Sequence, residues 1–394
     1  MVQTSSNSWL IKHVQTIVSD QIVEGSVVVE DGKIAKIIEG DAIPAPYEQL
    51  ETVDGLGGWL LPGFIDMHVH GGGGADFMEA NREAYETITR FHASKGTTRM
   101  LATTVTASPE AIAAVLEATH AYRDGDDMPN TVLQGVHLEG PFISEKWPGA
   151  QNPAFIVTPQ VEWIQAWNEQ YPGLMKQITF APEKENAIAL TEYLAESGIV
   201  AAAGHTDALY SQVVDAADAG LTQAVHTFNA MRGLHHREPG TVGAVLTDHR
   251  IHAELIADGH HVHPAAIRLL VAAKPRDRVI LITDAMSAAG LGDGQYDLGG
   301  LVVDVADGVA RLRDGGALAG STLTMIDAFR FMLAHTGLSV AEVSQMASGN
   351  PARQLGIDDV TGSIAEGKLA DLVLTDTSFT DVRRTWVEGR QIFG

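Results

Sequence analysis

Eight short strand-like runs alternate with helical stretches through the middle of the chain, and this alternation constrains the fold more than any other feature. The strand-like runs occupy residues 64–69, 98–104, 132–138, 177–181, 199–203, 223–226, 252–257 and 279–283. Helices are predicted between most of them, at residues 81–95, 109–123, 186–197, 209–219 and 264–273. Strands that alternate with helices pair in parallel, so the pattern predicts an α/β fold of the (β/α)8 TIM-barrel type. An open, doubly wound sheet is the alternative.

Both ends of the chain are β-rich. Residues 26–30 and 33–38 are β-branched runs on either side of an Asp-Gly turn, which is the signature of a hairpin. Residues 371–375 and 382–387 read as further short strands before a Glu-Gly turn. An isolated hairpin is only marginally stable in water, so we expect the two ends to complete one small β-sandwich domain. The predicted division is a β domain of residues 1–61 and 358–394 and a barrel domain of residues 62–357.

Two irregular insertions interrupt the alternation. One covers residues 140–159, after the third strand, and the other covers residues 285–321, after the eighth. Long loops within a compact domain are usually functional, so both are candidates to border a site. Helices predicted at residues 322–335 and 340–348 then lead back to the β-rich C-terminus.

The charge balance of the 394-residue chain limits its partners. It has 50 acidic and 26 basic residues, a net charge of −24, which argues against nucleic acid and against membrane surfaces. Cysteine is absent, so any metal must be held by His, Asp and Glu. The first 13 residues lack the pattern of a signal peptide, and no apolar run approaches the length of about 18 residues that a membrane helix needs. We therefore expect a soluble cytoplasmic protein.

Residues able to bind a metal stand at the ends of five of the eight predicted strands. The C-terminal strand ends of a (β/α)8 barrel surround its active site. His68 and His70 are two residues apart on a strand and so point to the same face. A mixture of imidazole and carboxylate suits Zn²⁺, Fe²⁺ or a related divalent ion, so we predict a metal site here. In chain order the candidates are His68, His70, Glu139, His205, His226 and Asp284.

Motifs over nearly the whole chain resemble those of the amidohydrolase superfamily. The shared features are the His68-x-His70 pair, the histidines that end the fifth and sixth strands, and the aspartate that ends the eighth. Glu139 on the third strand, where many relatives use a modified Lys on the fourth, is a more specific mark. Four stretches resemble the N-acetylglucosamine-6-phosphate deacetylases in particular: residues 137–142 with 149–153, 226–231 with 237–240, 257–262, and 318–325.

The resemblance implies how the metal ligands divide. Glu139, His205 and His226 would hold a principal divalent metal, with zinc favoured over Fe²⁺ or another ion. His68 and His70, with Glu139 as a bridge, would hold a second. Because the His-x-His pair is intact in this chain, the number of metals per subunit stays open at one or two.

The resemblance also implies the reaction. Asp284 would be the general acid and base that takes a proton from the attacking water and passes it to the leaving sugar amine. The expected products are acetate and glucosamine 6-phosphate. The alternatives are another amidohydrolase that acts on a cyclic amide or on a different N-acetylated sugar and, from another class of protein, a catalytically inactive scaffold of the same fold.

Residues for the sugar phosphate are implied by the same resemblance. Arg237 and His261 would contact the phosphate, with help from the backbone near Asn229 and Ala230, and the partners of a homodimer would exchange these contacts across their interface. The forked donors of Arg suit phosphate, although an ion pair with Glu238 is the simpler interpretation of Arg237.

One position departs from the resemblance. Many relatives carry a His that contacts the substrate carbonyl where this chain has Gln151, whose amide can donate a hydrogen bond but cannot carry charge. Lys146 and Trp147 in the same loop either close over the sugar or are simply exposed to solvent. His137 precedes Glu139 by two residues, and we expect it to support the ligands rather than bind metal.

Overall fold

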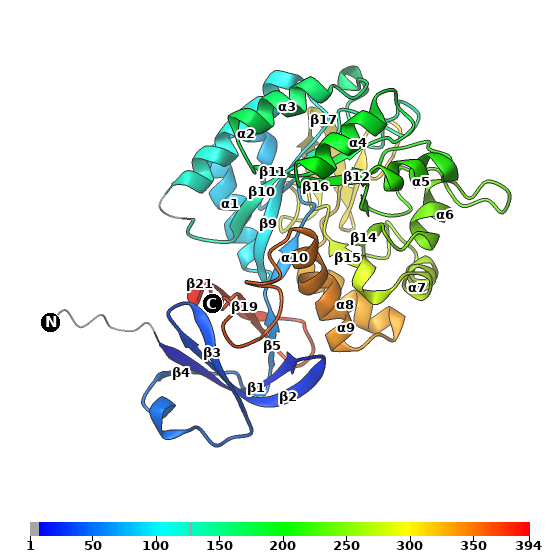
Figure 1. Cartoon of the computed structure of the whole chain (residues 1–394). Helices are drawn as coiled ribbons and strands as arrows, with labels where there is room; N and C mark the ends of the chain where they lie inside the picture. The colour runs from blue at the N-terminus through cyan, green and yellow to red at the C-terminus, as the bar shows by residue number, and fades with distance from the viewer. Residues whose placement is uncertain (1–7, 126–127) are drawn as a thin grey trace.

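The structure is a computed structural model that describes residues 8–125 and 128–394. Eight parallel strands follow one another around a sheet, each hydrogen-bonded to the next (Figure 1). The sheet closes beyond its edge strands, where Val69 bridges Ala285 in parallel and the Asp284 amide donates to the His68 carbonyl at 2.9 Å. The predicted barrel is therefore confirmed. Its strands are β6 (Phe64–Asp66), β9 (Thr97–Thr104), β10 (Val132–Glu139), β11 (Met175–Phe180), β12 (Val200–Ala203), β13 (Gln223–Ala224), β14 (His252–Ile256) and β15 (Val279–Ile282).

Helices surround the barrel. Those that match the sequence prediction are α1 (Arg82–Ala93), α2 (Pro109–Asp124), α4 (Ala187–Glu196), α5 (Tyr210–Asp218), α7 (Pro264–Ala273), α8 (Met325–Thr336) and α9 (Val340–Ser344). The prediction missed α3 (Val161–Gln170) and α6 (Gly240–Thr247), and a π-helical turn (Gln345–Gly349) and α10 (Asn350–Gln354) follow α9. Two glycines in α6 lower its helix propensity, so its burial against the barrel rather than its local sequence stabilises it. Among the described residues, no helix has both the length and the apolar character to cross a membrane.

Strands from both termini form the second sheet. Strand β5 pairs with β19 in antiparallel fashion, which joins the two ends of the chain, and hydrogen bonds connect all eight strands in a single sheet. The sheet lies at the N-terminal side of the barrel strands, where a buried ion pair of 2.7 Å joins Arg99 on β9 to Asp371. Its strands are β1 (Trp9–Val18), β2 (Gln21–Glu30), β3 (Lys33–Glu39), β4 (Glu51–Asp54), β5 (Trp59–Pro62), β19 (Leu372–Thr375), β20 (Val382–Val387) and β21 (Arg390–Phe393).

The insertion after β15 is ordered, so the prediction of an irregular segment there is wrong. It forms an antiparallel sheet of β16 (Gly294–Leu298), β17 (Leu301–Ala306) and β18 (Val309–Leu312). Its apolar face packs on Val105 and Met286 at the rim of the barrel. The Gly-Gly and Asp-Gly turns between these strands are hairpin signals that the sequence already carried. The insertion after β10 remains largely irregular, with one 3-10 turn (Pro153–Phe155).

Candidate active site

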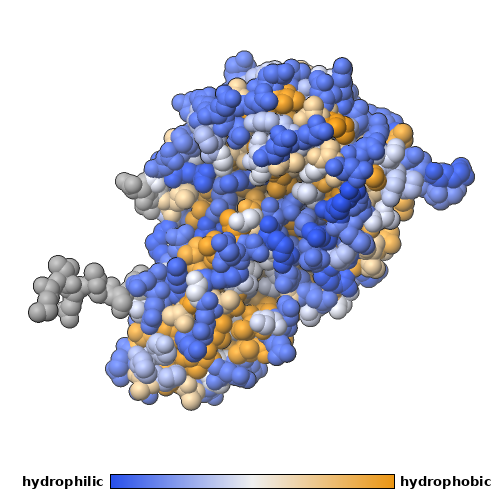
Figure 2. Space-filling model, in the orientation of Figure 1, coloured by the Kyte–Doolittle hydropathy of each residue, from blue (hydrophilic) through white to orange (hydrophobic). Residues whose placement is uncertain are grey.

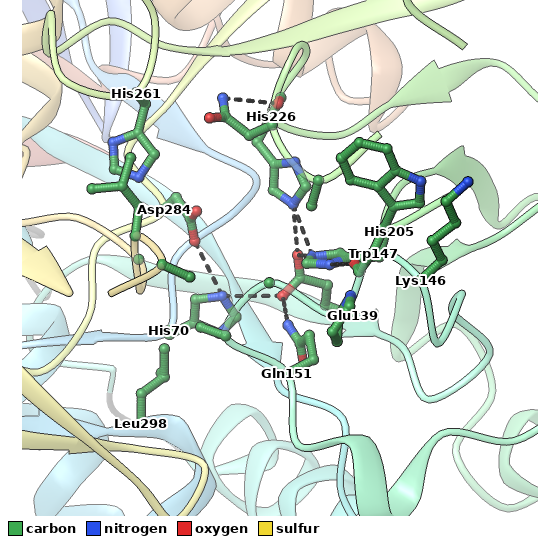
Figure 3. Close-up of a pocket in the computed structure, with 18 residues that line it drawn as sticks. His70, Glu139, Lys146, Trp147, Gln151, His205, His226, His261, Asp284 and Leu298 are labelled. Carbon is green, nitrogen blue, oxygen red and sulfur yellow. Dashed lines mark hydrogen bonds and ion pairs between the residues drawn. The ribbon is translucent and has the colours of Figure 1, made fainter. Parts of the chain in front are cut away.

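The six predicted metal-binding residues come together at the C-terminal mouth of the barrel, and all of them except His68 line a cavity of about 300 Å³ (Figure 3). Glu139 lies at the centre of the group. Its Oε1 is 3.2 Å from His205 Nε2, 3.1 Å from His226 Nε2 and 3.2 Å from His68 Nε2. Its Oε2 is 3.3 Å from His70 Nε2. One carboxylate therefore contacts four imidazoles contributed by three other barrel strands and the turns that follow them.

Three of these residues have an unusual backbone. His205, His226 and Asp284 have φ angles of +47°, +31° and +52°, in the left-handed region that non-glycine residues seldom occupy. Such conformations cost on the order of 1–3 kcal/mol each and cluster at functional sites. All three follow a barrel strand closely; His205 and His226 point toward Glu139, and Asp284 points toward His70 at the edge of the cavity (Figure 3).

Charges within the group reinforce one another. Burial opposes ionisation of Glu139, but the surrounding imidazoles outweigh it and hold the pKa of this carboxyl well below its usual range. Burial is likewise outweighed at Asp284, where His68 and His70 keep the carboxyl pKa below its usual value. Burial lowers the pKa of His70, yet its contacts with Asp284 and Glu139 raise it to about 9. The site therefore presents two ionised carboxylates at neutral pH.

The arrangement of donor atoms fits a divalent metal ion. Nε2 of His205 and Nε2 of His226 face one another at 3.1 Å, and buried Nε2 of His68 has no aligned hydrogen-bond partner among the described residues. Two overlapping sets of ligand atoms are close enough to hold an ion: His68, Glu139 and His226 in one, and His68, His70 and Asp284 in the other. Imidazole with carboxylate is a typical donor set for zinc and related ions.

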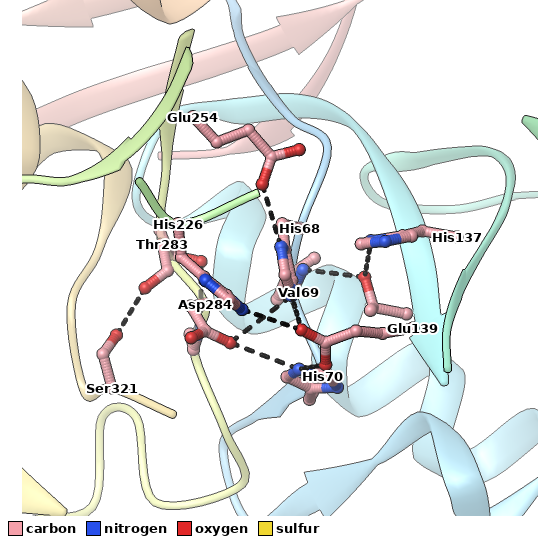
Figure 4. Close-up of polar contacts among 12 residues, drawn as sticks. His68, Val69, His70, His137, Glu139, His226, Glu254, Thr283, Asp284 and Ser321 are labelled. Carbon is pink, nitrogen blue, oxygen red and sulfur yellow. Dashed lines mark hydrogen bonds and ion pairs between the residues drawn. The ribbon is translucent and has the colours of Figure 1, made fainter. Parts of the chain in front are cut away.

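Sequence reasoning missed Glu254. This residue lies inside β14, and its Oε2 is 2.9 Å from Nδ1 of His68 (Figure 4). The available signal was a carboxylate in the middle of a buried apolar strand, where a charge needs a partner. His137 is also buried beneath the group, with Nε2 2.8 Å from Thr179 Oγ1, and it is not in either set of ligand atoms.

Gln151 lines the cavity and contacts the central carboxylate. Its Nε2 donates to Glu139 Oε2 at 2.6 Å, and its Oε1 accepts from the Thr106 amide at 2.6 Å. These two bonds fix which end of the amide faces Glu139. The side chain that replaces the expected His therefore lies beside the predicted metal ligands and donates a hydrogen bond to one of them, Glu139.

The other predicted substrate contacts fall into two groups. Asn229, Ala230 and His261 line the cavity. Nδ1 of His261 is 2.6 Å from Asp258 Oδ2, so its Nε2 is not engaged by that bond. Arg237 is exposed, on a hairpin loop (residues 232–239) that extends from the barrel beside α6, and the surface of this extension is hydrophilic (Figures 1 and 2). The structure of one chain therefore does not bring Arg237 into the cavity.

Lys146 and Trp147 border the cavity and are tied to one acidic residue. Asp207 accepts from Lys146 Nζ at 3.0 Å and from the Trp147 indole at 2.9 Å. The carbonyl oxygen of Trp147 is also 3.0 Å from Nδ1 of His205. The loop that carries these residues is thus anchored directly to one of the predicted metal ligands.

Known proteins resemble the chain in sequence and structure. It matches the Amidohydrolase family over residues 59–392. It is 39% identical to N-acetylglucosamine-6-phosphate deacetylase of Bacillus subtilis (strain 168) over 94% of each chain. It is 41% identical to N-acetylgalactosamine-6-phosphate deacetylase of Escherichia coli O157:H7 over 92% of this chain and 93% of that protein. A substituted N-acetyl-D-glucosamine-6-phosphate deacetylase from Mycobacterium smegmatis, solved in complex with N-acetyl-D-glucosamine-6-phosphate, has a TM-score of 0.91 and 34% identity over 98% of this chain and 100% of its own.

Proposed function

Because the chain belongs to the amidohydrolase family, we propose that it is a metal-dependent deacetylase that hydrolyses N-acetylglucosamine 6-phosphate to glucosamine 6-phosphate and acetate. The observation that carries this proposal is the convergence of four histidines, Glu139 and Asp284 beside one cavity of about 300 Å³, at the lower end of the range for small-molecule sites. The names of the similar proteins supply the substrate class.

We assign the metal ligands as the motifs imply. Glu139, His205 and His226 would hold the principal metal, and His68 and His70, together with Glu139, would hold a second. A divalent metal, with zinc favoured, supplies Lewis acidity that lowers the pKa of water to about 7 and polarises a carbonyl. Glu139 contributes the negative charge that offsets the cation, and the buried position of the group excludes competing water.

Asp284 moves the proton. Its Oδ1 lies 3.2 Å from His70 Nε2, its side chain borders the cavity, and its lowered pKa keeps it ionised and able to accept. As water adds to the acetamide carbon, Asp284 takes a proton from it. As the C–N bond breaks, Asp284 returns that proton to the nitrogen, so acetate and the free amine leave.

Gln151, His261 and the backbone at Asn229 and Ala230 orient the sugar. Nε2 of Gln151 uses one N–H on Glu139, and we assign the second to the acetamide carbonyl. His261 faces the cavity with Nε2 free of Asp258, so it serves the phosphate. A sugar phosphate is an intracellular metabolite, which favours a cytoplasmic enzyme, and the net charge of −24 argues against nucleic acid and membrane partners.

Purified protein loaded with zinc is expected to release acetate from N-acetylglucosamine 6-phosphate, because the four histidines, Glu139 and Asp284 converge beside the cavity. The measurement is acetate production in parallel with metal content. Protein treated with a chelator and then resupplied with zinc is the control. Metal-replete protein that releases no acetate would rule the proposed activity out.

A second substrate is favoured by one relative. The 41% identity to an N-acetylgalactosamine-6-phosphate deacetylase lies between the 39% and 42% identities to two N-acetylglucosamine-6-phosphate deacetylases, and the two sugars differ only in the configuration at C4. The ratio of kcat/KM for the two substrates in one assay decides between them. A higher value for the galactose epimer would reassign the physiological substrate without changing the mechanism.

Arg237 gives a prediction about the phosphate and the partner subunit. We propose that the chain forms a homodimer in which Arg237 of one protomer contacts the phosphate bound by the other. Its place on an extended loop outside its own cavity supports this. Arg237→Ala is expected to raise KM about 10- to 100-fold for the phosphorylated substrate, because a charge-assisted hydrogen bond contributes about 1.5–3 kcal/mol. KM for unphosphorylated N-acetylglucosamine is the matched control.

A mixing experiment separates action across the interface from action within one chain. Arg237→Ala protein and Asp284→Asn protein, unfolded and refolded together, form mixed dimers in which one site has its own Asp284 and the partner's Arg237. Recovery of a low-KM component in the mixture supports the proposal. Equal effects of Arg237→Ala on both substrates, or a monomer by analytical ultracentrifugation, would contradict it.

A further inference from the structure

A group of three buried polar residues from three barrel strands lies directly beneath the proposed metal-binding side chains. We name Glu254, Gln177 and Gln223 the polar layer; all three side chains have no exposed surface. They belong to β14, β11 and β13. Nothing in the proposed reaction uses them, because they face the barrel interior and do not line the cavity.

The polar layer holds one ionisable carboxylate with few degrees of freedom. Oε1 of Glu254 accepts from Gln177 Nε2 at 2.8 Å and from Gln223 Nε2 at 2.5 Å. Gln223 also donates to Gln177 Oε1 at 2.8 Å, which fixes the orientation of the Gln177 amide. A buried carboxylate is costly unless its oxygens are hydrogen-bonded, so both glutamines stabilise Glu254 where it stands.

The other oxygen of Glu254 is directed at His68. Oε2 lies 2.9 Å from Nδ1 of His68, and across the ring Nε2 of His68 points to Glu139 Oε1 at 3.2 Å and Asp284 Oδ1 at 3.6 Å (Figure 4). Since a carboxylate can only accept, Nδ1 must carry the proton in this contact. The tautomer with a free Nε2 lone pair is therefore the one that suits both Glu254 and a metal ion.

The other three histidines of the site are held differently. Nδ1 of His205 faces the carbonyl oxygen of Trp147 at 3.0 Å, a neutral acceptor. Nδ1 of His70 and Nδ1 of His226 are buried without a hydrogen-bond partner among the described residues. Within the part of the chain that the structure describes, His68 is thus distinguished by a carboxylate behind its ring, and it is also the histidine shared by both sets of possible ligand atoms.

We propose that Glu254 is a positioning residue for His68: it holds the imidazole in one orientation and one tautomer, so that Nε2 is ready to bind metal. The inference rests on the proposed metal site and deepens it. A carboxylate behind a ligating histidine also strengthens that nitrogen as a donor. The polar layer in turn prevents Glu254 from turning away, because each of its oxygens already has a fixed partner.

The test is zinc affinity, measured by competition with a chromophoric chelator and independent of turnover. Glu254→Gln keeps the shape of the side chain but replaces a carboxylate that accepts hydrogen bonds from Gln177, Gln223 and His68. The amide NH2 group would then face at least one of these N–H donors, and that hydrogen bond would be lost. The affinity of the site that includes His68 is expected to fall about 10- to 100-fold, the usual effect of losing such a partner. Glu254→Asp keeps the charge but shortens the reach, and an intermediate loss is expected.

Two controls separate positioning from general damage. His252→Gln changes a buried residue of the same strand that contacts the Thr222 carbonyl and Arg278, outside the site, so it should alter thermal stability and leave zinc affinity unchanged. Each Glu254 variant is also made in a His68→Ala background. If Glu254 acts through His68, its replacement there should cost no further affinity.

The outcomes are distinct. Loss of affinity in the natural background but not in the His68→Ala background supports the proposal. An equal loss in both backgrounds, or no loss in either, overturns it. If Glu254→Gln protein does not fold without metal, as judged by circular dichroism, the same comparison is made with Glu254→Asp. Natural protein that binds no divalent metal would instead contradict the proposed function, and the two failures cannot be confused.

Discussion

Replacing Asp284 by Asn is expected to lower kcat about 10²- to 10⁴-fold, the usual contribution of a general acid–base residue. The amide has nearly the same shape but cannot accept the proton of the attacking water or return it to the sugar amine. KM should change little, because the shape of the cavity is kept. The measurements are kcat in the acetate assay and zinc content of the same preparation.

A matched control for Asp284→Asn is Asp297→Asn. Asp297 is exposed, next to Leu298 at the rim of the cavity, so its replacement makes the same change in charge without contacting the ligands. If the Asp284→Asn protein has a kcat near that of the natural protein, Asp284 does not take part in proton transfer. Loss of zinc along with kcat would show that Asp284 acts as a metal ligand, which its distance to His70 also permits.

Glu139→Gln is expected to abolish stable binding of the principal metal and to lower kcat/KM by about 10³-fold or more. Among the residues that the structure describes, Glu139 is the one carboxylate within 3.3 Å of the Nε2 atoms of all four histidines, so its loss leaves a cluster of imidazoles without the anion that offsets a cation. Metal catalysis contributes several kcal/mol, and each ~1.4 kcal/mol corresponds to a factor of ten in rate. Elemental analysis and kcat/KM measure the two effects.

Glu183→Gln is the matched control for Glu139→Gln. Glu183 also follows a barrel strand, and it accepts from the Asp207 amide at 2.7 Å, but it does not line the cavity. The Glu183→Gln protein should keep its full zinc content. If Glu139→Gln protein retains zinc at the natural stoichiometry, the central role of this carboxylate is wrong, and the histidines with Asp284 must hold the ion without it.

Much of the site could be predicted because its residues stand at the C-terminal ends of the strands of a barrel built from repeated strand–helix units. His205, His226 and Asp284 each follow a strand that could be recognised from local pattern. Once the strands are assigned to a closed parallel barrel, their C-terminal ends must meet on one side. The convergence of these three residues could therefore be predicted without knowing any distance between side chains.

Other features could not be obtained in this way. Glu254 lies within a strand rather than at its end, and its partner His68 is 186 residues away in the sequence. Gln151 could be identified as a departure from a motif, but its contact with Glu139 depends on how an irregular loop folds back over the barrel. Arg237 belongs to a recognisable motif, yet only the structure shows that it lies on an extended loop outside the cavity of its own chain.

The sequence by itself determined the barrel, the β domain shared by both termini and the chemical types of the proposed metal ligands, because strand periodicity and strand ends are local properties. Only the tertiary structure decided which atoms meet. Barrel closure sets His68 opposite Glu254 and Asp284, and the packing of three barrel strands brings Gln177 and Gln223 within hydrogen-bonding distance of Glu254. Such contacts depend on the relative shift of strands far apart in the chain, and no local pattern of residues encodes that shift.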